Sequence, residues 1–411
     1  MVSSLPKIAV TGPFTDINFG DYGMLVNNVY DLDARNLLLF SYNEDFLKCL
    51  EDDYFQGLAI KTAEVVLKEG LKNIFSVQKN LTPFDLLRYV NNLDEITCKL
   101  SEVDILLVNG GGYFNALWAL PHRIERLAQI VIPILIANRL GKKIVFSGNG
   151  FGPFDDSSEF FSCLFGSLKN VSFSCRDNLY SPVWMRQLGI SGKKLQFIPD
   201  DLLLINKNLE ELPTSFLVSS ENYIVMETYL PLDFIEENKD IFSGFSNKMH
   251  DKYGLDIVFL PFHVGVGGVH QGKLLEQHLD NFEFVDISKK GYLPIQDAVN
   301  IIKNAKLVLS NRYHAVVLAL KSATPTVSVL KDVVGDKRYY YNKNRGVLDQ
   351  VLSGANLNEE FYFCSDYLEA LEYVGDNYLE IVSHQAKNYQ AVHKINVDDL
   401  ADARSDFINT F

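Results

Sequence analysis

Short apolar runs recur along the chain, and each run ends at a turn signal and precedes a helical pattern of apolar positions. Because the runs are apolar at consecutive positions, they fit strands that are buried on both faces of a parallel sheet. Strands that alternate with helices predict βαβ units and doubly wound sheets. The predicted strands lie within residues 8–12, 104–112, 143–150, 171–177, 195–200, 223–228, 256–263, 282–288, 306–312 and 324–330.

A polar stretch at residues 206–222, which contains Pro213 and has no apolar period, is the best candidate for a domain boundary. Predicted strands lie on both sides of it, enough for two separate sheets. We therefore predict an α/β fold of two doubly wound domains that face each other across a cleft. The N-terminal domain is predicted at residues 1–208 and the C-terminal domain at 209–365, with an amphipathic helical segment at 366–411 that packs back on the domains.

Composition excludes several classes of function. The chain has 411 residues, with 38 Lys and Arg against 52 Asp and Glu, and a formal net charge of −14. A pI near 5.1 argues against nucleic acid as a partner, although a few local arginines suffice for an anionic small substrate. No signal-peptide pattern is present, and the longest apolar stretch, residues 127–140, is interrupted by polar residues and too short to span a bilayer. Five scattered cysteines without a CxxC motif indicate reduced thiols, so we expect a cytoplasmic protein.

Candidate chemistry gathers where predicted strands end, because ligands of open α/β sheets bind outside the carboxyl ends of the strands. After the first strand come Asn18, Gly20 and Asp21, and Asp21 is placed to cap a helix that begins near Tyr22. A plain capped loop explains this segment equally well.

A run of three glycines follows the second strand, at Gly110, Gly111 and Gly112. Glycines let another backbone or a ligand approach closely, and we expect a helix after them whose N–H groups suit an anion or a sugar hydroxyl. Close packing between the domains is an equally good explanation.

Two further strand ends carry arginine. Gly148, Gly150 and Gly152 end one strand, and Arg176 and Asp177 follow the next. An arginine at a strand's carboxyl end can hold an oxyanion through two parallel hydrogen bonds. The alternative is a local Arg176–Asp177 pair at the surface.

The last strand end is the most polar. Ser310 ends a strand, Arg312 and His314 follow in the turn, and an apolar helix comes next. Such a cluster between apolar segments is costly to bury unless its members are paired. The alternative is a structural His314 that bonds a backbone carbonyl at the helix start.

Three other patterns do not support a site. Residues 267–274 have the spacing of a phosphate loop, but Leu274 stands where Ser or Thr would hold Mg²⁺. His263 and His270 bracket this loop without the spacing of a zinc site, which favours a flexible substrate loop at 263–273. No GxSxG motif of a serine hydrolase is present.

Taken in order, these blocks resemble the polysaccharide pyruvyl transferases over residues 18 to about 330. The resemblance implies two Rossmann-like domains in a GT-B-like arrangement, and transfer of pyruvate from phosphoenolpyruvate to a sugar as a carboxyethylidene ketal. By match, His314 is the acid/base residue, and Arg312 and Arg176 hold the donor. The blocks are Asn18-x-Gly20-Asp21, Gly110-Gly111-Gly112, Gly148-x-Gly150-x-Gly152-Pro153, Ser174-x-Arg176-Asp177, Pro199-Asp200 and Ser310-x-Arg312-x-His314-Ala315.

The remaining block residues are expected to bind substrate, with the donor on the C-terminal domain and the acceptor on the N-terminal one. The sequence departs from the family pattern in two places: Asp201 follows Asp200 where the family usually has Pro, and residues 329–331 lack the usual Tyr. The expected substrate-binding residues are Asn18, Gly20, Asp21, Gly110, Gly111, Gly112, Gly148, Asp177, Asp200 and Ser310.

The residue types suit this chemistry independently. Phosphoenolpyruvate carries a phosphate and a carboxylate, for which arginine forks are preferred partners. Protonation of its C3 calls for an acid that titrates near neutrality, such as histidine. No metal or redox cofactor is required. We expect a pyruvyltransferase that acts on a nucleotide-linked or lipid-linked precursor of a capsule or exopolysaccharide, a role compatible with a peripheral position at the inner membrane face. The alternatives are a GT-B glycosyltransferase that uses a sugar nucleotide and a catalytically silent glycan-binding relative.

Overall fold

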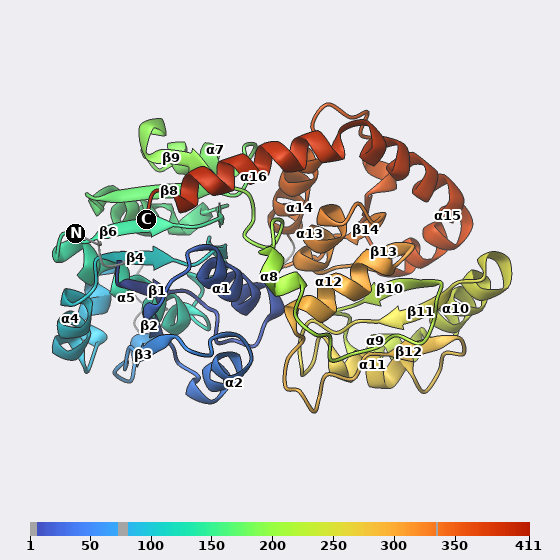
Figure 1. The fold of residues 1–411 in the computed structure, drawn as a ribbon, viewed down its shortest axis with the longest axis horizontal. Helices are drawn as coiled ribbons and strands as arrows, with labels where there is room; N and C mark the ends of the chain where they lie inside the picture. The colour runs from blue at the N-terminus through green and yellow to red at the C-terminus, as the bar shows by residue number, and fades with distance from the viewer. Residues whose placement is uncertain (1–5, 73–80, 334–335) are drawn as a thin grey trace. The chain divides into compact units, whose positions relative to one another are not determined.

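The computed structural model describes residues 6–72, 81–333 and 336–411 (Figure 1). Contacts within the chain divide it into two units. Unit 1 comprises residues 1–16, 20–201 and 402–411, and unit 2 comprises residues 17–19 and 202–401. The division thus falls between Asp201 and Leu202, and the predicted C-terminal segment is shared between the units.

Unit 1 is built on a parallel sheet. Among the described residues this sheet has nine strands in the order β3-β2-β1-β4-β6-β8-β7-β5, with β9 paired to β8. The strand order reverses between β1 and β4, which makes the carboxyl ends of these two strands the topological switch point where ligands of such sheets bind. The strands are β1 (Ile8–Thr11), β2 (Asn36–Phe40), β3 (Ala59–Ala63), β4 (Ile105–Val108), β5 (Gly111–Phe114), β6 (Lys143–Phe146), β7 (Asn149–Phe151), β8 (Val171–Cys175) and β9 (Leu195–Phe197).

Apolar side chains explain why these elements form. All four residues of β4 are buried, and the one-letter sequence IVIPILIA of α5 is buried on nearly all sides. Phenylalanines from β5, β6 and β8 pack with those of α6 in the core, as between Phe173 and Phe165, whose ring centroids are 5.4 Å apart. The helices are α1 (Phe19–Asp31), α2 (Glu44–Tyr54), α4 (Leu93–Ser101), α5 (Ile124–Arg139), α6 (Ser158–Ser167) and α7 (Ser181–Gln187), with 3₁₀ turns η1 (Pro83–Tyr89), η2 (Asp155–Ser157) and η3 (Gly192–Lys194).

Unit 2 is a second parallel sheet with its own core. Its described strands follow the order β12-β11-β10-β13-β14-β15, which is the 3-2-1-4-5-6 order of a Rossmann fold. The switch point therefore lies between β10 and β13. The strands are β10 (Tyr223–Glu227), β11 (Asp256–Phe259), β12 (Phe282–Phe284), β13 (Leu307–Ser310), β14 (Thr326–Val329) and β15 (Phe363–Cys364).

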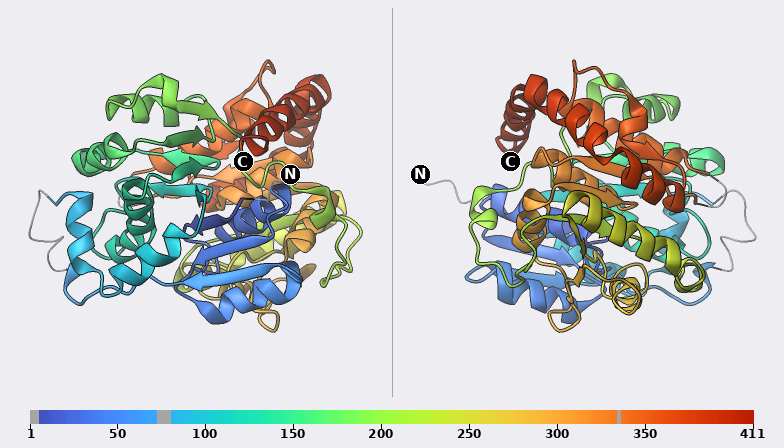
Figure 2. Two further views of the ribbon diagram at one scale, coloured as in Figure 1. Left: turned by 60° about the vertical axis from the view of Figure 1, so that its left-hand side comes forward. Right: turned by 90° about the vertical axis from the view of Figure 1, so that its right-hand side faces the viewer.

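Two long helices, α15 and α16, follow the sheet of unit 2, and Figure 2 shows them from two sides; α16 continues past residue 401 into the residues of unit 1. Asp366 starts α15 by accepting hydrogen bonds from the backbone N–H groups of Leu368 and Glu369. The helices from residue 202 on are α8 (Lys207–Glu210), α9 (Leu232–Glu237), α10 (Lys239–Tyr253), α11 (Val269–Leu275), α12 (Ile295–Asn304), α13 (Tyr313–Lys321), α14 (Arg338–Val351), α15 (Tyr367–Asn388) and α16 (Lys394–Ile408), with the 3₁₀ turn η4 (Glu359–Phe361) and the π-helical turn η5 (Tyr389–His393).

The predicted fold class is confirmed: both units are parallel α/β sheets, and each of the predicted strands is present. The prediction of a helix directly after Gly110–Gly112 is wrong. Residues 111–114 continue as strand β5, which pairs with β7, and the next helix begins at Ile124. The first helix begins at Phe19, earlier than expected near Tyr22, and the predicted loop at 263–273 contains the first residues of α11.

Candidate functional site

The switch point of unit 2 holds a buried ion pair. Glu227 and Ser310 are partners in the register of β10 and β13, and Ser310 Oγ donates to Glu227 Oε2 at 2.8 Å. Arg312 Nε donates to Glu227 Oε1 at 2.9 Å, and the backbone N–H of Arg312 donates to Ser310 Oγ. Burial raises the pKa of Glu227, and the neighbouring guanidinium opposes this shift. The predicted residues Ser310 and Arg312 are therefore held together by a glutamate that sequence analysis did not single out.

Arg312 also connects two loops. Its Nη1 donates to Asn18 Oδ1 at 3.1 Å, and its Nη2 donates to the carbonyl oxygen of Gly267. Its guanidinium carbon lies 3.6 Å from the ring centroid of Tyr229. Asn18, which was expected on the acceptor side with Asp21, thus belongs by its contacts to the Arg312 cluster.

His314 is the second residue of α13, directly after this cluster, and is partly buried beside the ring of Tyr313, at 4.9 Å between centroids. Two lysines bring further positive charge to the neighbouring tyrosine rings. Lys331 Nζ lies 3.8 Å from the ring centroid of Tyr229, and Lys343 Nζ lies 5.1 Å from that of Tyr313. The surroundings of Arg312 and His314 are thus cationic and aromatic, which suits an anionic ligand.

His263 lies close enough to Arg312 for the two charges to interact. Its Nδ1 accepts a hydrogen bond from the backbone N–H of Gly265 at 3.0 Å. Burial lowers the pKa of His263, and the charges of Arg312 and His270 lower it further. A neutral imidazole that accepts at Nδ1 carries its proton on Nε2.

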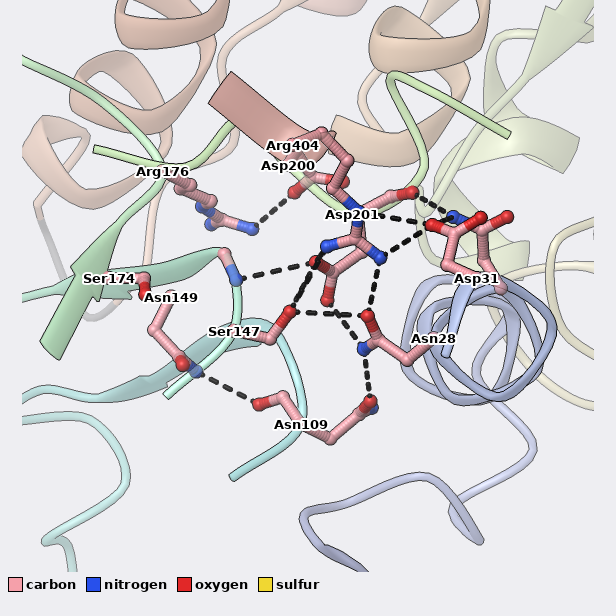
Figure 3. A network of polar contacts seen from close by, with 12 residues as sticks. Asn28, Asp31, Asn109, Ser147, Asn149, Ser174, Arg176, Asp200, Asp201 and Arg404 are labelled. Carbon is pink, nitrogen blue, oxygen red and sulfur yellow. Dashed lines mark hydrogen bonds and ion pairs between the residues drawn. The ribbon is translucent and has the colours of Figure 1, made fainter. Parts of the chain in front are cut away.

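A second buried network occupies the strand ends of unit 1 (Figure 3). Arg404 of α16 donates from Nη1 to Asp201 Oδ1 at 2.6 Å, and from Nε and Nη2 to Asp31 Oδ2 at 3.0 and 2.8 Å. Asp201 also accepts from Asn28 Nδ2 at 2.9 Å and from the Ser147 hydroxyl. The side chains of Asp201 and Arg404 are 0% and 4% exposed, so this is an ion-pair network in the interior.

Arg176 pairs with Asp200, not with its neighbour in sequence. Arg176 Nη1 donates to Asp200 Oδ2 at 2.9 Å, and both side chains are buried. Asp177 instead accepts hydrogen bonds from the backbone N–H groups of Leu179, Tyr180 and Ser181, in the turn that leads into α7. A surface Arg176–Asp177 pair, the alternative from sequence, is therefore wrong.

The predicted glycines are explained by close packing inside unit 1. A Cβ on Gly110 would lie 2.2 Å from a carboxylate oxygen of Asp201, and one on Gly148 would lie 2.5 Å from the carbonyl oxygen of Pro199. Gly111 has φ +140°, and the carbonyl oxygen of Gly112 accepts from Asn115 Nδ2 at 2.8 Å. Gly20 is buried in the first turn of α1. The Gly110–Gly112 segment lies near Asp21, whose carbonyl oxygen accepts from Asn109 Nδ2.

Sequence reasoning missed residues that complete these clusters. Glu227 carried a signal, because it is a carboxylate at the end of an apolar strand. Nothing in the sequence pointed to Arg404, because it lies 203 residues from its partner Asp201. Within the described part of the chain, no group of three or more His, Cys, Asp or Glu residues is arranged to hold a metal ion. No described helix is both long enough and apolar enough to cross a membrane.

Comparison with known proteins gives a family and a fold. Residues 20–331 match the sequence model of the polysaccharide pyruvyl transferase family, and no curated protein matches the chain. Among solved structures, similar folds include Staphylococcus aureus MnaA with UDP (12% identity, TM-score 0.58, 99% of this chain and 98% of that one). They also include UDP-GlcNAc 2-epimerase from Neisseria meningitidis bound to UDP-GlcNAc (11%, 0.59, 98% of each chain). A putative UDP-N-acetylglucosamine 2-epimerase from Listeria monocytogenes is similar as well (10%, 0.60, 100% of this chain and 98% of that one). At these identities the likeness establishes the GT-B-like fold alone.

Proposed function

Because the chain belongs to the polysaccharide pyruvyl transferase family, we propose that it transfers pyruvate from phosphoenolpyruvate to a sugar of a surface-polysaccharide precursor. The product is a carboxyethylidene ketal, and phosphate is released. The observation that carries the proposal is the buried Glu227–Ser310–Arg312 cluster at the switch point of unit 2, which directly precedes His314. The cluster lies inside the region that matches the family.

The donor is proposed to bind at this cluster. Glu227 fixes the Arg312 guanidinium by its Nε, and Asn18 contacts Nη1, so Arg312 presents its charge in one orientation. Lys331 and Lys343 add cations beside it. A molecule with a phosphate and a carboxylate is well matched to such a set of cations.

His314 is proposed as the general acid. It gives a proton to C3 of phosphoenolpyruvate, so that C2 becomes electrophilic and accepts a sugar hydroxyl. Loss of phosphate and closure by a second hydroxyl then complete the ketal. The two hydroxyl protons balance the proton gained at C3 and the one that leaves with phosphate. We assign acceptor binding to unit 1, near Asp21 and the Gly110–Gly112 segment, and donor contacts in that unit to Arg176, which Asp200 orients.

The test is a conversion assay with three proteins: the wild type, His314→Gln and the control His250→Gln, whose side chain is exposed and pairs with Asp256. Each is incubated with phosphoenolpyruvate and a pool of UDP-glucose, UDP-galactose, UDP-N-acetylglucosamine and a polyprenyl-diphosphate-linked N-acetylglucosamine. Phosphate release and the mass of the sugar product are measured. We expect ketal formation by the wild type and the control, and turnover about 10²–10⁴-fold lower in His314→Gln.

Two results would contradict the proposal. Transfer of a sugar from a UDP-sugar without consumption of phosphoenolpyruvate would make the protein a glycosyltransferase. A folded His314→Gln protein with wild-type turnover would remove the acid role from His314. Arg312→Ala is a poor test, because it leaves Glu227 buried without its guanidinium and disturbs folding as well as binding.

A further inference from the structure

A carboxylate, a phenol and a guanidinium meet at the strand ends of unit 1, outside the networks described above. Asp16 lies in the loop after β1, Tyr42 lies just after β2, and Arg126 belongs to α5. Arg126 Nε is 3.5 Å from Asp16 Oδ1, and its guanidinium carbon is 3.7 Å from the ring centroid of Tyr42. The Asp16 side chain is 31% exposed, so it is held by its neighbours and still open to a ligand.

This cluster lies beside Asp21, one of the residues that we propose to bind the acceptor sugar. The charge of Asp21 acts on Tyr42, and a Cβ on Gly111 would lie 3.6 Å from Asp21 Oδ1. Arg123, whose charge acts on Asp16, lies with its guanidinium carbon 5.6 Å from the ring centroid of Trp118. A few fixed polar groups beside aromatic rings are typical of sites that bind small polar ligands such as sugars.

The electrostatics make Asp16 a stronger base than an ordinary aspartate. Burial raises its pKa, against the opposing effects of Arg126, the neighbouring Tyr42 hydroxyl and Arg123. Burial and the charges of Asp16 and Asp21 raise the pKa of Tyr42 as well, so its hydroxyl keeps its proton near neutral pH. A carboxylate whose pKa is moved toward neutrality accepts a proton more readily in a transition state.

We propose that Asp16 is the general base that deprotonates the attacking acceptor hydroxyl, with Arg126, which packs on the Tyr42 ring, holding the carboxylate in place. The inference rests on the proposed function. In the step, the acceptor O–H bond breaks, its electron pair forms the bond from oxygen to C2 of the donor, and the proton passes to Asp16. C3 receives its proton from His314. When the second hydroxyl closes the ketal, the C2–O bond to phosphate breaks, the Asp16 proton leaves with the phosphate, and the proton of the second hydroxyl returns to His314.

The test compares Asp16→Asn and Asp16→Glu with the control Asp33→Asn, whose carboxylate is 76% exposed and lies 3.6 Å from Arg35. The assay is the one described above, with kcat, KM and the pH profile measured for the pooled acceptors. Asp16→Asn is expected to lower kcat about 10²–10⁴-fold, and Asp16→Glu to restore part of it. The acid limb of the wild-type pH profile, where Asp16 becomes protonated, should be absent from the residual activity of Asp16→Asn.

Stability separates a base from a structural residue. Because the folded-state pKa of Asp16 is raised, its ionised form opposes folding near neutral pH, so Asp16→Asn should not lower the Tm at pH 7. Thermal stabilisation by phosphoenolpyruvate alone should be the same in the wild type and in Asp16→Asn. A kcat within threefold of the wild type with the acid limb intact would overturn the inference, as would a lower Tm with activity that returns on cooling. If the wild type forms no ketal at all, the proposed function is wrong, and the role of Asp16 as general base is wrong as well.

Discussion

At the scale of single residues, three arginines are buried in the described part of the chain, and each is matched by carboxylates: Arg312 by Glu227, Arg176 by Asp200, and Arg404 by Asp201 and Asp31. Removing one member of such a pair leaves a buried charge uncompensated, which costs about 3–5 kcal/mol. Loss of activity in a single arginine variant therefore does not separate binding from folding. Neutralising both members of a pair, or altering a histidine, is more informative.

His263 provides a residue-scale prediction about pH. Burial and the charge of Arg312 lower the pKa of His263 in the folded state, whereas in the unfolded chain it is near 6.5. At a pH between these two values, the unfolded chain therefore binds more protons than the folded protein does. The free energy of unfolding should therefore fall as the pH drops below about 6.5. Urea denaturation at pH 7.5 and 5.5 measures this loss. In His263→Gln the loss should be smaller than in the wild type, by up to about 1.4 kcal/mol.

His384 is the matched control for this experiment, because burial and the charge of Lys387 lower its pKa too. His384→Gln should retain the share of the pH dependence that belongs to His263. An equal loss of stability in the wild type and in His263→Gln would contradict the assignment.

At the scale of elements, the turn before α7 depends on a single carboxylate. Asp177 is 5% exposed, and its Oδ1 accepts three backbone N–H bonds, from Leu179, Tyr180 and Ser181. Asp177→Ala should lower the free energy of unfolding by about 1–3 kcal/mol, because buried donors lose a charged acceptor. Asp177→Asn, which keeps an oxygen acceptor, should lose less. Denaturant midpoints of the two variants measure the difference, and equal midpoints would mean that the turn does not depend on this carboxylate.

The elements also show what the sequence could predict. Strands β10, β11 and β13 are apolar runs that can be recognised in the sequence. Strand β2 contains the apolar run LLLF and could have been predicted in the same way. Strand β5, with the sequence GGYF, could not, because glycines give no apolar run and only its pairing with β7 makes it a strand. The βαβ pattern predicts which residues follow the carboxyl ends of strands, so Ser310 and Arg312 were placed correctly relative to the sheet. The partners that hold them depend on contacts far apart in sequence, such as Asn18 with Arg312.

At the scale of the whole molecule, the chain returns to unit 1 after it has built unit 2. Residues 402–411 belong to unit 1, and through Arg404 they supply the guanidinium that matches Asp31 and Asp201. Phe407 is buried as well, and Lys143 Nζ donates to the carbonyl oxygen of Thr410. Unit 1 is therefore complete only when the end of the described chain is in place, although most of its sheet precedes residue 202.

Deleting residues 402–411 should consequently destabilise unit 1 more than unit 2. Without Arg404, the carboxylate of Asp201 stays buried beside Ser147 with no cation, at a cost of about 3–5 kcal/mol. Hydrogen exchange measured by mass spectrometry should then speed up in peptides of β4 and β6, and change little in those of β10 and β13. Deletion of residues 409–411 alone, which keeps Arg404, is the control and should have a small effect. Restoring residues 402–411 with the triple variant Arg404→Met, Asp201→Asn and Asp31→Asn should recover much of the protection, because none of the three charges is then left unmatched. Unchanged exchange in β4 and β6 after the larger deletion would mean that the C-terminal segment does not stabilise unit 1.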